Sequence, residues 1–391
     1  MSKKKIIIVN NNLNIGGIQK SLVNLLNEIK DIYDIDLLLF SQNGDYLNEI
    51  PKEVRLVECK SWYKYLGISQ NQCKSIKDKL TRGLLALITK IFGRSFSLKL
   101  ISKTQKIIEG DYDCAISFLH NGSNNSFYGG CNEFVLQKIN AKQKIGWLHC
   151  DFALCGANNI QNIKNYLKFD KIVACSQGCL DSFKSCVDID EKKLFVVGNC
   201  SNFKEIKKLA NQDTIVYDSS KINIVSVARL SYEKGIDRAL NAMAYLKEKG
   251  IAFTYHIVGG GPLYNDLVSQ TKKLGIQDCV IFYGNQSNPY KYMKNADFLF
   301  IPSRHEAAPM VINEALSLGI PILSTSTSSA KVMLIDTGYG IVCENNEDDL
   351  KRALFQMTKE KKLLVNLKEK LHFVYFNNKK TVDIICNNLF I

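Results

Sequence analysis

The stretch DFLFIPSRHEAAPMVINEALSLGIP, Asp297 to Pro321, contains a strand, a loop and a helix in succession. Its first seven residues are mostly apolar, which is typical of a buried strand in a parallel sheet. Pro309 suits the first turn of a helix, and Gly319 with the proline after it ends that helix. Glu306 follows the strand and Glu314 lies eight residues further on, so the two carboxylates either face water or hold a ligand.

Strand-length apolar runs alternate with amphipathic stretches of helix length along nearly the whole chain. This alternation indicates βαβ units and parallel sheets. A chain of 391 residues exceeds the usual size of one core, and the series restarts near residue 220. We therefore predict an α/β protein with two Rossmann-like doubly wound domains, residues 1–200 and 201–370, facing a central cleft. The predicted strands are KIIIVN (5–10), IDLLLFS (35–41), CAISFL (114–119), QKIGWLH (143–149), KIVACS (171–176), LFVVGN (194–199), INIVSVARL (222–230), FTYHIVG (253–259), CVIFYG (279–284), DFLFIPS (297–303) and PILST (321–325).

The composition is that of a globular protein, with 46% hydrophobic and 23% charged residues. The 13 cysteines are scattered without a CxxC pair or a signal-peptide pattern, which favours a reducing cytoplasm. No apolar run approaches the roughly 18 residues that a membrane-spanning helix needs. We expect a cytoplasmic protein that does not span a bilayer.

The net charge of +13 is concentrated between Lys60 and Lys106. This segment contains eleven Lys or Arg residues and one acid, Asp78, so its net charge is 11 minus 1, or +10. Within this basic segment, apolar residues at helical spacing accompany three cations: Leu84, Leu87, Ile88, Ile91 and Phe92 with Arg82, Lys90 and Arg94. The pattern predicts a basic amphipathic helix. Such a helix either lies on an anionic membrane surface or packs its apolar face on its own domain. No nucleic-acid-binding motif accompanies the charge, so nucleic acid is not an expected partner.

In open parallel sheets, ligands bind beyond the carboxyl ends of the strands. In the first domain, Gly16 and Gly17 precede a helix whose start can bind a phosphate, although such glycines also serve as tight turns. The full GxGxxG pattern is not met, which disfavours a nicotinamide oxidoreductase. His120 and His149 each follow a strand, and their positions alone do not choose between them.

In the second domain, Arg229 ends a strand and Lys234 precedes a helix, so the two cations could neutralise a departing diphosphate or be ordinary surface charges. Glycines 259–261 end another strand and would admit a ligand to the backbone. A carboxylate at position 306 and another at 314 can accept hydrogen bonds from the hydroxyls of one ligand. That arrangement suits a sugar and a ribose. The alternatives are that Glu306 is an acid at a helix start and that Glu314 lies on an exposed helix face.

Taken in order, these motifs resemble the retaining glycosyltransferases of family 4 (glycosyl transferases group 1), which have the GT-B architecture. The matching stretches are the Gly16–Gly17 loop, WLHCD, ARLSYEKG, IVGGGP, NPYKYMKNADFLFIPS and EAAPMVINEALSLGIP, the last being similar to the family's EX7E motif. The resemblance implies that a C-terminal helix, residues 371–391, packs back on the first domain.

The same resemblance implies a role for each matched residue. Glu306 contacts the hydroxyls of the donor sugar, Glu314 contacts the ribose, and His149 lies near the reacting sugar. Cations and glycine N–H groups stabilise the leaving diphosphate, namely Arg229, Lys234 and Gly16 or Gly17. The remaining donor-binding residues are Gly260, Pro309, Met310 and Val311.

No metal or cofactor is expected besides the nucleotide-sugar donor, because cations and dipoles can stabilise the leaving group. Three Asp-x-Asp triplets occur at 34–36, 111–113 and 188–190. All three precede apolar strands, so we interpret them as capping or turn acids rather than metal ligands.

The sequence thus predicts a retaining, hexosyltransferase-type enzyme that moves a sugar from a UDP-sugar to a lipid-linked or polysaccharide hydroxyl during surface glycan biosynthesis. It would act at the inner face of the membrane, bound through residues 60–106, with glycan-assembly partners. The alternatives are a non-catalytic nucleotide-sugar-binding or scaffold subunit of a transferase complex, and another GT-B enzyme such as an epimerase.

Overall fold

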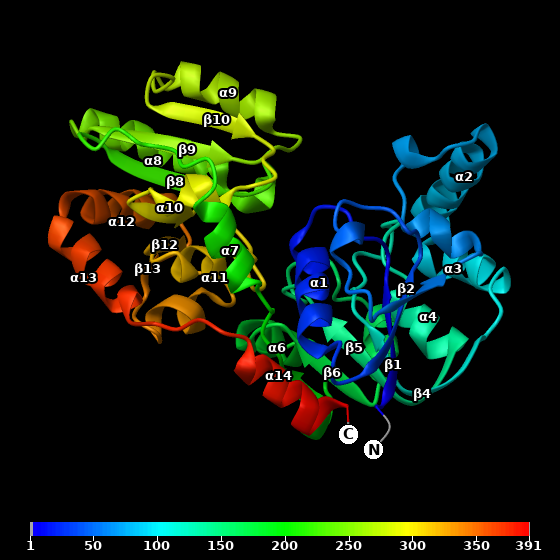
Figure 1. The fold of residues 1–391 in the computed structure, drawn as a ribbon. Helices are drawn as coiled ribbons and strands as arrows, with labels where there is room; N and C mark the ends of the chain where they lie inside the picture. Colours follow the sequence, from blue (N-terminus) through cyan, green and yellow to red (C-terminus); the bar gives the residue numbers. More distant parts are fainter. Residues whose placement is uncertain (1–2, 391) are drawn as a thin grey trace. The chain divides into compact units, whose positions relative to one another are not determined.

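The computed structural model describes residues 3–390, which divide into two compact units (Figure 1). Unit 1 comprises the chain up to Cys200 together with the segment from Asn378 onward, and unit 2 comprises Ser201–Asn377. Each unit contains its own parallel sheet and its own hydrophobic core.

The sheet of unit 1 has the strand order β3-β2-β1-β4-β5-β6-β7, with every pair parallel. All six strands predicted for this half are present, the first with the predicted ends and the other five with shifted ends. The unpredicted β3 is a short, mostly exposed edge strand, RLVE, which lacks an apolar run. The strands are β1 Lys5–Asn10, β2 Asp34–Leu39, β3 Arg55–Glu58, β4 Ile108–Ser117, β5 Ile139–Leu148, β6 Lys171–Ala174 and β7 Leu194–Val196.

Helices cover this sheet, and the apolar stripe of α1 packs into the core beside β1 and β2. The chain end joins the same core, because Ile385 and Leu389 of the π-helical turn η7 (Ile385–Leu389) are fully buried there. The segment that returns to unit 1 starts at Asn378 instead of 371, since α13 continues to His372 in unit 2. The α-helices of unit 1 are α1 Gly17–Ile29, α2 Ile76–Phe92, α3 Arg94–Lys103, α4 Cys131–Lys138, α5 Ile160–Tyr166, α6 Gln177–Lys184 and α14 Lys379–Ile384.

The sheet of unit 2 has the order β10-β9-β8-β11-β12-β13, again parallel throughout. The five predicted strands are present, and β13 is an additional edge strand. The strands are β8 Ile222–Val227, β9 Phe253–Val258, β10 Val280–Gly284, β11 Phe298–Ile301, β12 Ile322–Thr325 and β13 Gly340–Cys343. The α-helices are α7 Phe203–Ala210, α8 Ile236–Glu248, α9 Tyr264–Lys273, α10 Tyr290–Lys294, α11 Met310–Ser317, α12 Glu347–Lys359 and α13 Lys361–His372.

Both sheets reverse their strand order at one point, between β1 and β4 in unit 1 and between β8 and β11 in unit 2. Loops at such a switch point diverge and leave room for a ligand beyond the carboxyl ends of the strands. In unit 2 the loops after β8 and β11 therefore define the candidate site. In unit 1 the corresponding loop follows β1.

The interpretation of the Asp-x-Asp triplets as capping or turn acids is wrong for two of the three. Asp36 lies inside β2 and is buried, where it accepts hydrogen bonds from Arg55 on β3 and from the Tyr112 hydroxyl at 2.6 Å. Burial alone would raise its pKa, but these two partners hold the pKa below its usual value. The triplet at 111–113 lies within β4, whereas Asp190 caps the 3-10 turn η4 (Glu191–Lys193) as expected.

Candidate active site

The candidate site in unit 2 is assembled by two loops that leave neighbouring strands. The first follows β8 and contains the 3-10 turn η5 (Tyr232–Lys234), before α8 begins. The second follows β11 and runs to Pro309, the residue directly before α11. Because β8 and β11 are paired and parallel, both loops emerge at the same edge of the sheet.

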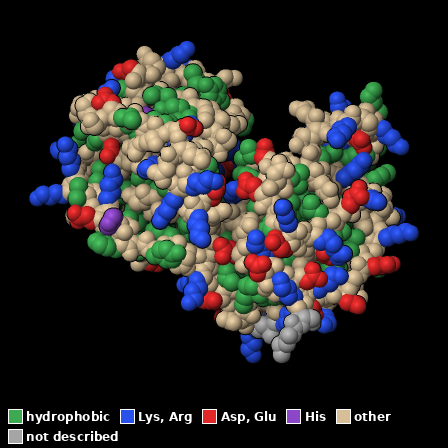
Figure 2. Space-filling model, in the orientation of Figure 1, with side chains coloured by type: hydrophobic (Ala, Val, Ile, Leu, Met, Phe, Trp, Pro, Cys, Tyr) green, Lys and Arg blue, Asp and Glu red, His purple; other side chains and the backbone are tan. Residues whose placement is uncertain are grey.

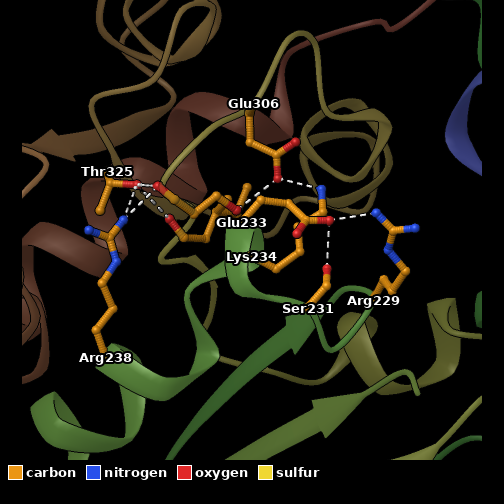
Figure 3. Close-up of polar contacts among 9 residues, drawn as sticks. Arg229, Ser231, Glu233, Lys234, Arg238, Glu306 and Thr325 are labelled. Carbon is orange, nitrogen blue, oxygen red and sulfur yellow. Dashed lines mark hydrogen bonds and ion pairs between the residues drawn. The ribbon is translucent and has the colours of Figure 1, made fainter. Parts of the chain in front are cut away.

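Lys234 and Glu306 form an ion pair across these loops (Figure 3). The Lys234 Nζ lies 2.6 Å from Glu306 Oε1, and the Ser303 hydroxyl donates to the same oxygen at 2.7 Å. The two side chains of the pair are only 24% and 10% exposed. Among residues 3–390, Glu306 Oε2 accepts no hydrogen bond, so it can accept one from a ligand hydroxyl.

Arg229 has a carboxylate partner that the sequence interpretation missed. Its guanidinium lies 2.5 Å from Glu233 Oε1, which also accepts a hydrogen bond from the Ser231 hydroxyl at 2.6 Å. Burial would raise the pKa of Glu233, but the Ser231 hydroxyl, the backbone and Arg229 hold its pKa below the usual value. Arg229 is 69% exposed. Each of the two predicted cations is therefore paired separately, and the remaining guanidinium N–H groups of Arg229 face solvent.

A buried arginine on α8 holds the second loop in place. The Arg238 Nε donates to the Pro302 carbonyl at 2.7 Å and its Nη2 donates to the Ser303 carbonyl at 2.6 Å. The Thr325 hydroxyl donates to the same Ser303 carbonyl at 2.5 Å. These contacts fix the backbone that carries Ser303 and Glu306 (Figure 3). The sequence gives no signal for this role, because Arg238 looks like an ordinary helix residue.

Gly235 allows the close approach of the two loops. Its φ of +66° lies in the left-handed region, and an added Cβ would lie 2.0 Å from the Pro302 carbonyl oxygen. This glycine is therefore required by packing between the first loop and the end of β11.

The glycines after β9 separate into packing residues and one candidate ligand contact. Gly259 and Gly261 have positive φ, and a Cβ on either would lie within 2.4 Å of a backbone oxygen of the segment after β8. Gly260 lacks a positive φ, and the three atoms nearest to its Cβ would all belong to the Asn285 side chain. The fold thus explains the glycines at 259 and 261, while Gly260 remains the one predicted to lie against the donor.

Glu314 lies within α11 and is half-buried, with the Tyr290 hydroxyl 3.5 Å from its Oε1. Met310 and Val311 form the first turn of the same helix and are also half-buried. No acid occupies that turn and no side chain caps it. The helix start therefore keeps backbone N–H groups able to bind an anion.

In unit 1 the predicted glycine pair starts α1. Gly16 has an extended backbone, and an added Cβ would clash with the flexible end of Gln19 alone, so the fold itself makes little demand for glycine there. Helix α1 also begins without a side-chain cap or a first-turn acid. This helix start resembles that of α11 in its capacity to bind an anion.

The two candidate histidines follow neighbouring strands of unit 1, His120 after β4 and His149 after β5. Burial lowers the pKa of His149 to about 3, with a further contribution from His120. Burial and then Arg94 lower the pKa of His120 to about 4. His149 packs against Phe118 and Trp147, and its Nε2 is buried without a partner among residues 3–390. His149 is thus a neutral imidazole at neutral pH, able to hydrogen-bond but not to act as a cation.

Comparison with known proteins decides the class of protein. Residues 211–372 match the family described as glycosyl transferases group 1. Unit 2 is a glycosyl transferases group 1 domain. A Campylobacter jejuni relative, N-acetylgalactosamine-N,N'-diacetylbacillosaminyl-diphospho-undecaprenol 4-alpha-N-acetylgalactosaminyltransferase, is 24% identical, over 91% of this chain and 90% of its own length. The chain is therefore a glycosyltransferase, and the scaffold alternative is set aside.

Solved structures show the fold of this glycosyltransferase. Anabaena Alr3699/HepE in complex with UDP superposes with a TM-score of 0.67 at 16% identity, covering 98% of this chain and 99% of that one. WaaG, a glycosyltransferase involved in lipopolysaccharide biosynthesis, superposes with a TM-score of 0.60 at 16% identity, over 98% of this chain and the whole of the other. The predicted GT-B fold with two Rossmann-like domains is confirmed.

Within the glycosyltransferase, the structure brings Lys234 into contact with Glu306 and places Arg229 on the same loop beside Glu233. Glu314 belongs to the helix that follows Glu306. Gly16, Gly17 and His149 belong to unit 1, at the carboxyl ends of their own strands. The site of unit 2 thus holds cations, carboxylates and an open helix start, which are the groups that bind a phosphorylated sugar.

Proposed function

We propose that this glycosyltransferase transfers a sugar from a UDP-sugar to a lipid-linked or polysaccharide hydroxyl in surface glycan biosynthesis, with retention of anomeric configuration. It would work at the inner face of the membrane. The observation that carries the proposal is the half-buried Lys234–Glu306 pair at the switch point of unit 2. Lys234 supplies a cation for a diphosphate, and Glu306 supplies an oxygen that can accept a hydrogen bond from a sugar. Because the two side chains are in contact, they suit the place where a diphosphate is joined to a sugar.

Glu306 is proposed to bind the donor sugar. Its Oε1 is engaged by Lys234 and Ser303, which leaves Oε2 to accept from a sugar hydroxyl. The carboxylate is held rigidly by Arg238 through the loop backbone, so ligand binding need not order it. Glu314, further along α11, is proposed to accept from the ribose hydroxyls of the nucleotide.

Lys234 and Arg229 are proposed to stabilise the diphosphate as it leaves. Negative charge grows on the diphosphate oxygens when the bond to the sugar breaks, and cations already in position lower the barrier without reorganising. The helix start at Met310 is proposed to offer N–H groups to the same diphosphate, and the helix start at Gly17 in unit 1 remains a predicted phosphate-binding element. With these groups present, we propose that the reaction needs no metal or cofactor.

Retention requires the acceptor oxygen to attack from the face that the diphosphate leaves. In the proposed step the acceptor hydroxyl gives its proton to a departing diphosphate oxygen as the new bond forms. His149, neutral at working pH, would hydrogen-bond to a sugar hydroxyl close to the reacting carbon. No covalent enzyme intermediate is needed, so Glu306 can remain bound to Lys234.

The relatives support the substrate classes in this proposal. HepE has been solved with UDP, with UDP and glucose, and with UDP-glucose. The name of the Campylobacter jejuni relative specifies a saccharide on diphospho-undecaprenol as acceptor and an alpha linkage as product. A UDP-sugar donor and a lipid-linked saccharide acceptor are therefore the first substrates to examine.

The donor site is tested by thermal unfolding of the purified protein with a panel of UDP-, GDP-, ADP- and CMP-linked sugars. We expect one UDP-sugar to stabilise the protein, by about 2.7 kcal/mol at a hundred times its Kd. Glu314→Ala should weaken that shift, since it removes the proposed ribose contact. The matched control is Glu369→Ala, which removes an exposed glutamate of helix α13 in the same unit. Equal stabilisation of both variants would remove Glu314 from the donor site.

A further inference from the structure

Helix α2 of unit 1 presents an apolar stripe to solvent. The stripe consists of five side chains spaced by four, four, three and four residues, so they line one face of the helix within an arc of about 80°. All are more than half exposed: Ile76 77%, Leu80 69%, Leu84 58%, Leu87 53% and Ile91 62%. Exposed apolar residues that are scattered need no explanation, but a continuous stripe of this length does.

The opposite face of α2 is already occupied by its own unit. Leu85 is 2% exposed, and the Thr89 hydroxyl donates to Ser97 of α3 at 2.7 Å. Arg82 donates to the Ile68 carbonyl at 2.7 Å. The sequence left open whether the apolar face packs on its own domain or faces outward. The structure shows that residues such as Leu85 pack inward, while the stripe stays uncovered among residues 3–390.

Basic side chains border the stripe on both sides. At 100° per residue, Lys77 flanks one edge, and Lys79 and Lys90 flank the other; all three are exposed. The acid of the helix, Asp78, points away from the stripe and is bonded to Lys64 at 2.9 Å and to the Tyr65 hydroxyl at 2.8 Å. Figure 2 shows basic and hydrophobic side chains together at the surface of this part of unit 1. The exposed charge beside the stripe is thus positive.

We propose that this face of α2 inserts into the interface of an anionic membrane, with the stripe among the lipid chains and the lysines at the phosphates. An apolar stripe bordered by lysines is the pattern of helices that lie in the membrane plane. A second copy of this chain is the poorer occupant, since stripe-to-stripe pairing would bring like-charged lysines together. The functional role of this surface rests on the proposed lipid-linked acceptor. The test of membrane binding does not depend on that acceptor.

The inference is tested by flotation of the full chain with vesicles of phosphatidylcholine alone or with about 30% phosphatidylglycerol. We expect binding to the anionic vesicles, and Leu84→Gln with Leu87→Gln should lower the partition coefficient about tenfold or more. The matched control is Ile160→Gln, which changes a side chain of the same unit that is 73% exposed on another helix. The control should bind within about twofold of the wild type.

Two further measurements separate the outcomes. Changing Lys77, Lys79 and Lys90 together to Gln should weaken binding and reduce its dependence on salt, because it removes charge but leaves the stripe. Flotation that is absent in the wild type, or unchanged in both sets of variants, would overturn the proposal. A lipid-free dimer that the Leu84→Gln, Leu87→Gln variant loses would assign the stripe to a second copy instead. Stabilisation by a nucleotide sugar needs no vesicles, so it reports separately on the donor site.

Discussion

Lys234→Ala is expected to lower turnover about a hundredfold or more while leaving the protein folded. The Lys234 side chain is 24% exposed and its ammonium group lies 2.6 Å from Glu306 Oε1, where the proposed diphosphate leaves the sugar. Its loss removes the fixed positive charge that the leaving group requires and leaves Glu306 without its cation. Removal of one fixed donor at a developing oxyanion typically lowers kcat by about 10²–10³. The measurement is the rate of UDP release with saturating donor and acceptor.

The control for this experiment is Lys247→Ala. Lys247 is an exposed lysine of α8, with Asp278 2.7 Å away, so the change deletes an ion pair of the same kind outside the site. Turnover should stay within about twofold in this variant. A folded Lys234→Ala enzyme with wild-type turnover would remove Lys234 from the mechanism.

Coupling between Lys234 and Glu306 is expected in the same series. If the two residues act as one unit, the double variant Lys234→Ala, Glu306→Gln should be hardly slower than Lys234→Ala alone. If the two substitutions instead lowered turnover by separate factors that multiply in the double variant, a shared role would be contradicted.

Arg238→Met is expected to lower the free energy of unfolding by about 2–4 kcal/mol. Arg238 is 5% exposed, and its guanidinium donates to the Pro302 and Ser303 carbonyls. Methionine can fill much of the space but leaves buried carbonyls with fewer donors. Burial lowers the pKa of Arg238, so the site disfavours the charged guanidinium. The residue stabilises the loop through the hydrogen bonds that it donates. The measurement is urea unfolding of the full chain, monitored for unit 2.

The matched control is Arg352→Met on α12. That arginine is 75% exposed and pairs with Asp349 three residues earlier, so its loss should change stability by less than about 0.5 kcal/mol. If Arg238→Met were as mild as this control, the loop that carries Glu306 would be held by something other than Arg238.

The sequence was sufficient to predict the two sheets and the position of most candidate residues. Buried parallel strands are continuous apolar runs, and the rule that ligands bind beyond their carboxyl ends points directly to Arg229 and Glu306. Two edge strands escaped prediction, β3 and β13, because each has only four residues, and β3 is also partly polar. The acid Asp36 was misjudged because its partner Arg55 lies on such an unpredicted strand.

The pairing within the site could not be predicted. Contact between Lys234 and Glu306 depends on the adjacency of β8 and β11, which are far apart in sequence. Arg238 acts through backbone carbonyls, and a carbonyl leaves no signature in the sequence. The spacing of apolar residues identified α2 as amphipathic, but only the packing of Leu85 and Thr89 shows which side faces its own unit.

The measurement that tests the central proposal most directly is product analysis of a complete transfer reaction. The full-length enzyme is incubated with the UDP-sugar that stabilises it and a saccharide linked to a diphospho-polyprenol, without added metal and with a chelator. We expect one sugar to be added, UDP to be released in equal amount, and the new linkage to keep the alpha configuration of an alpha-linked donor. A beta-linked product, or no transfer until a metal is supplied, would contradict the proposal.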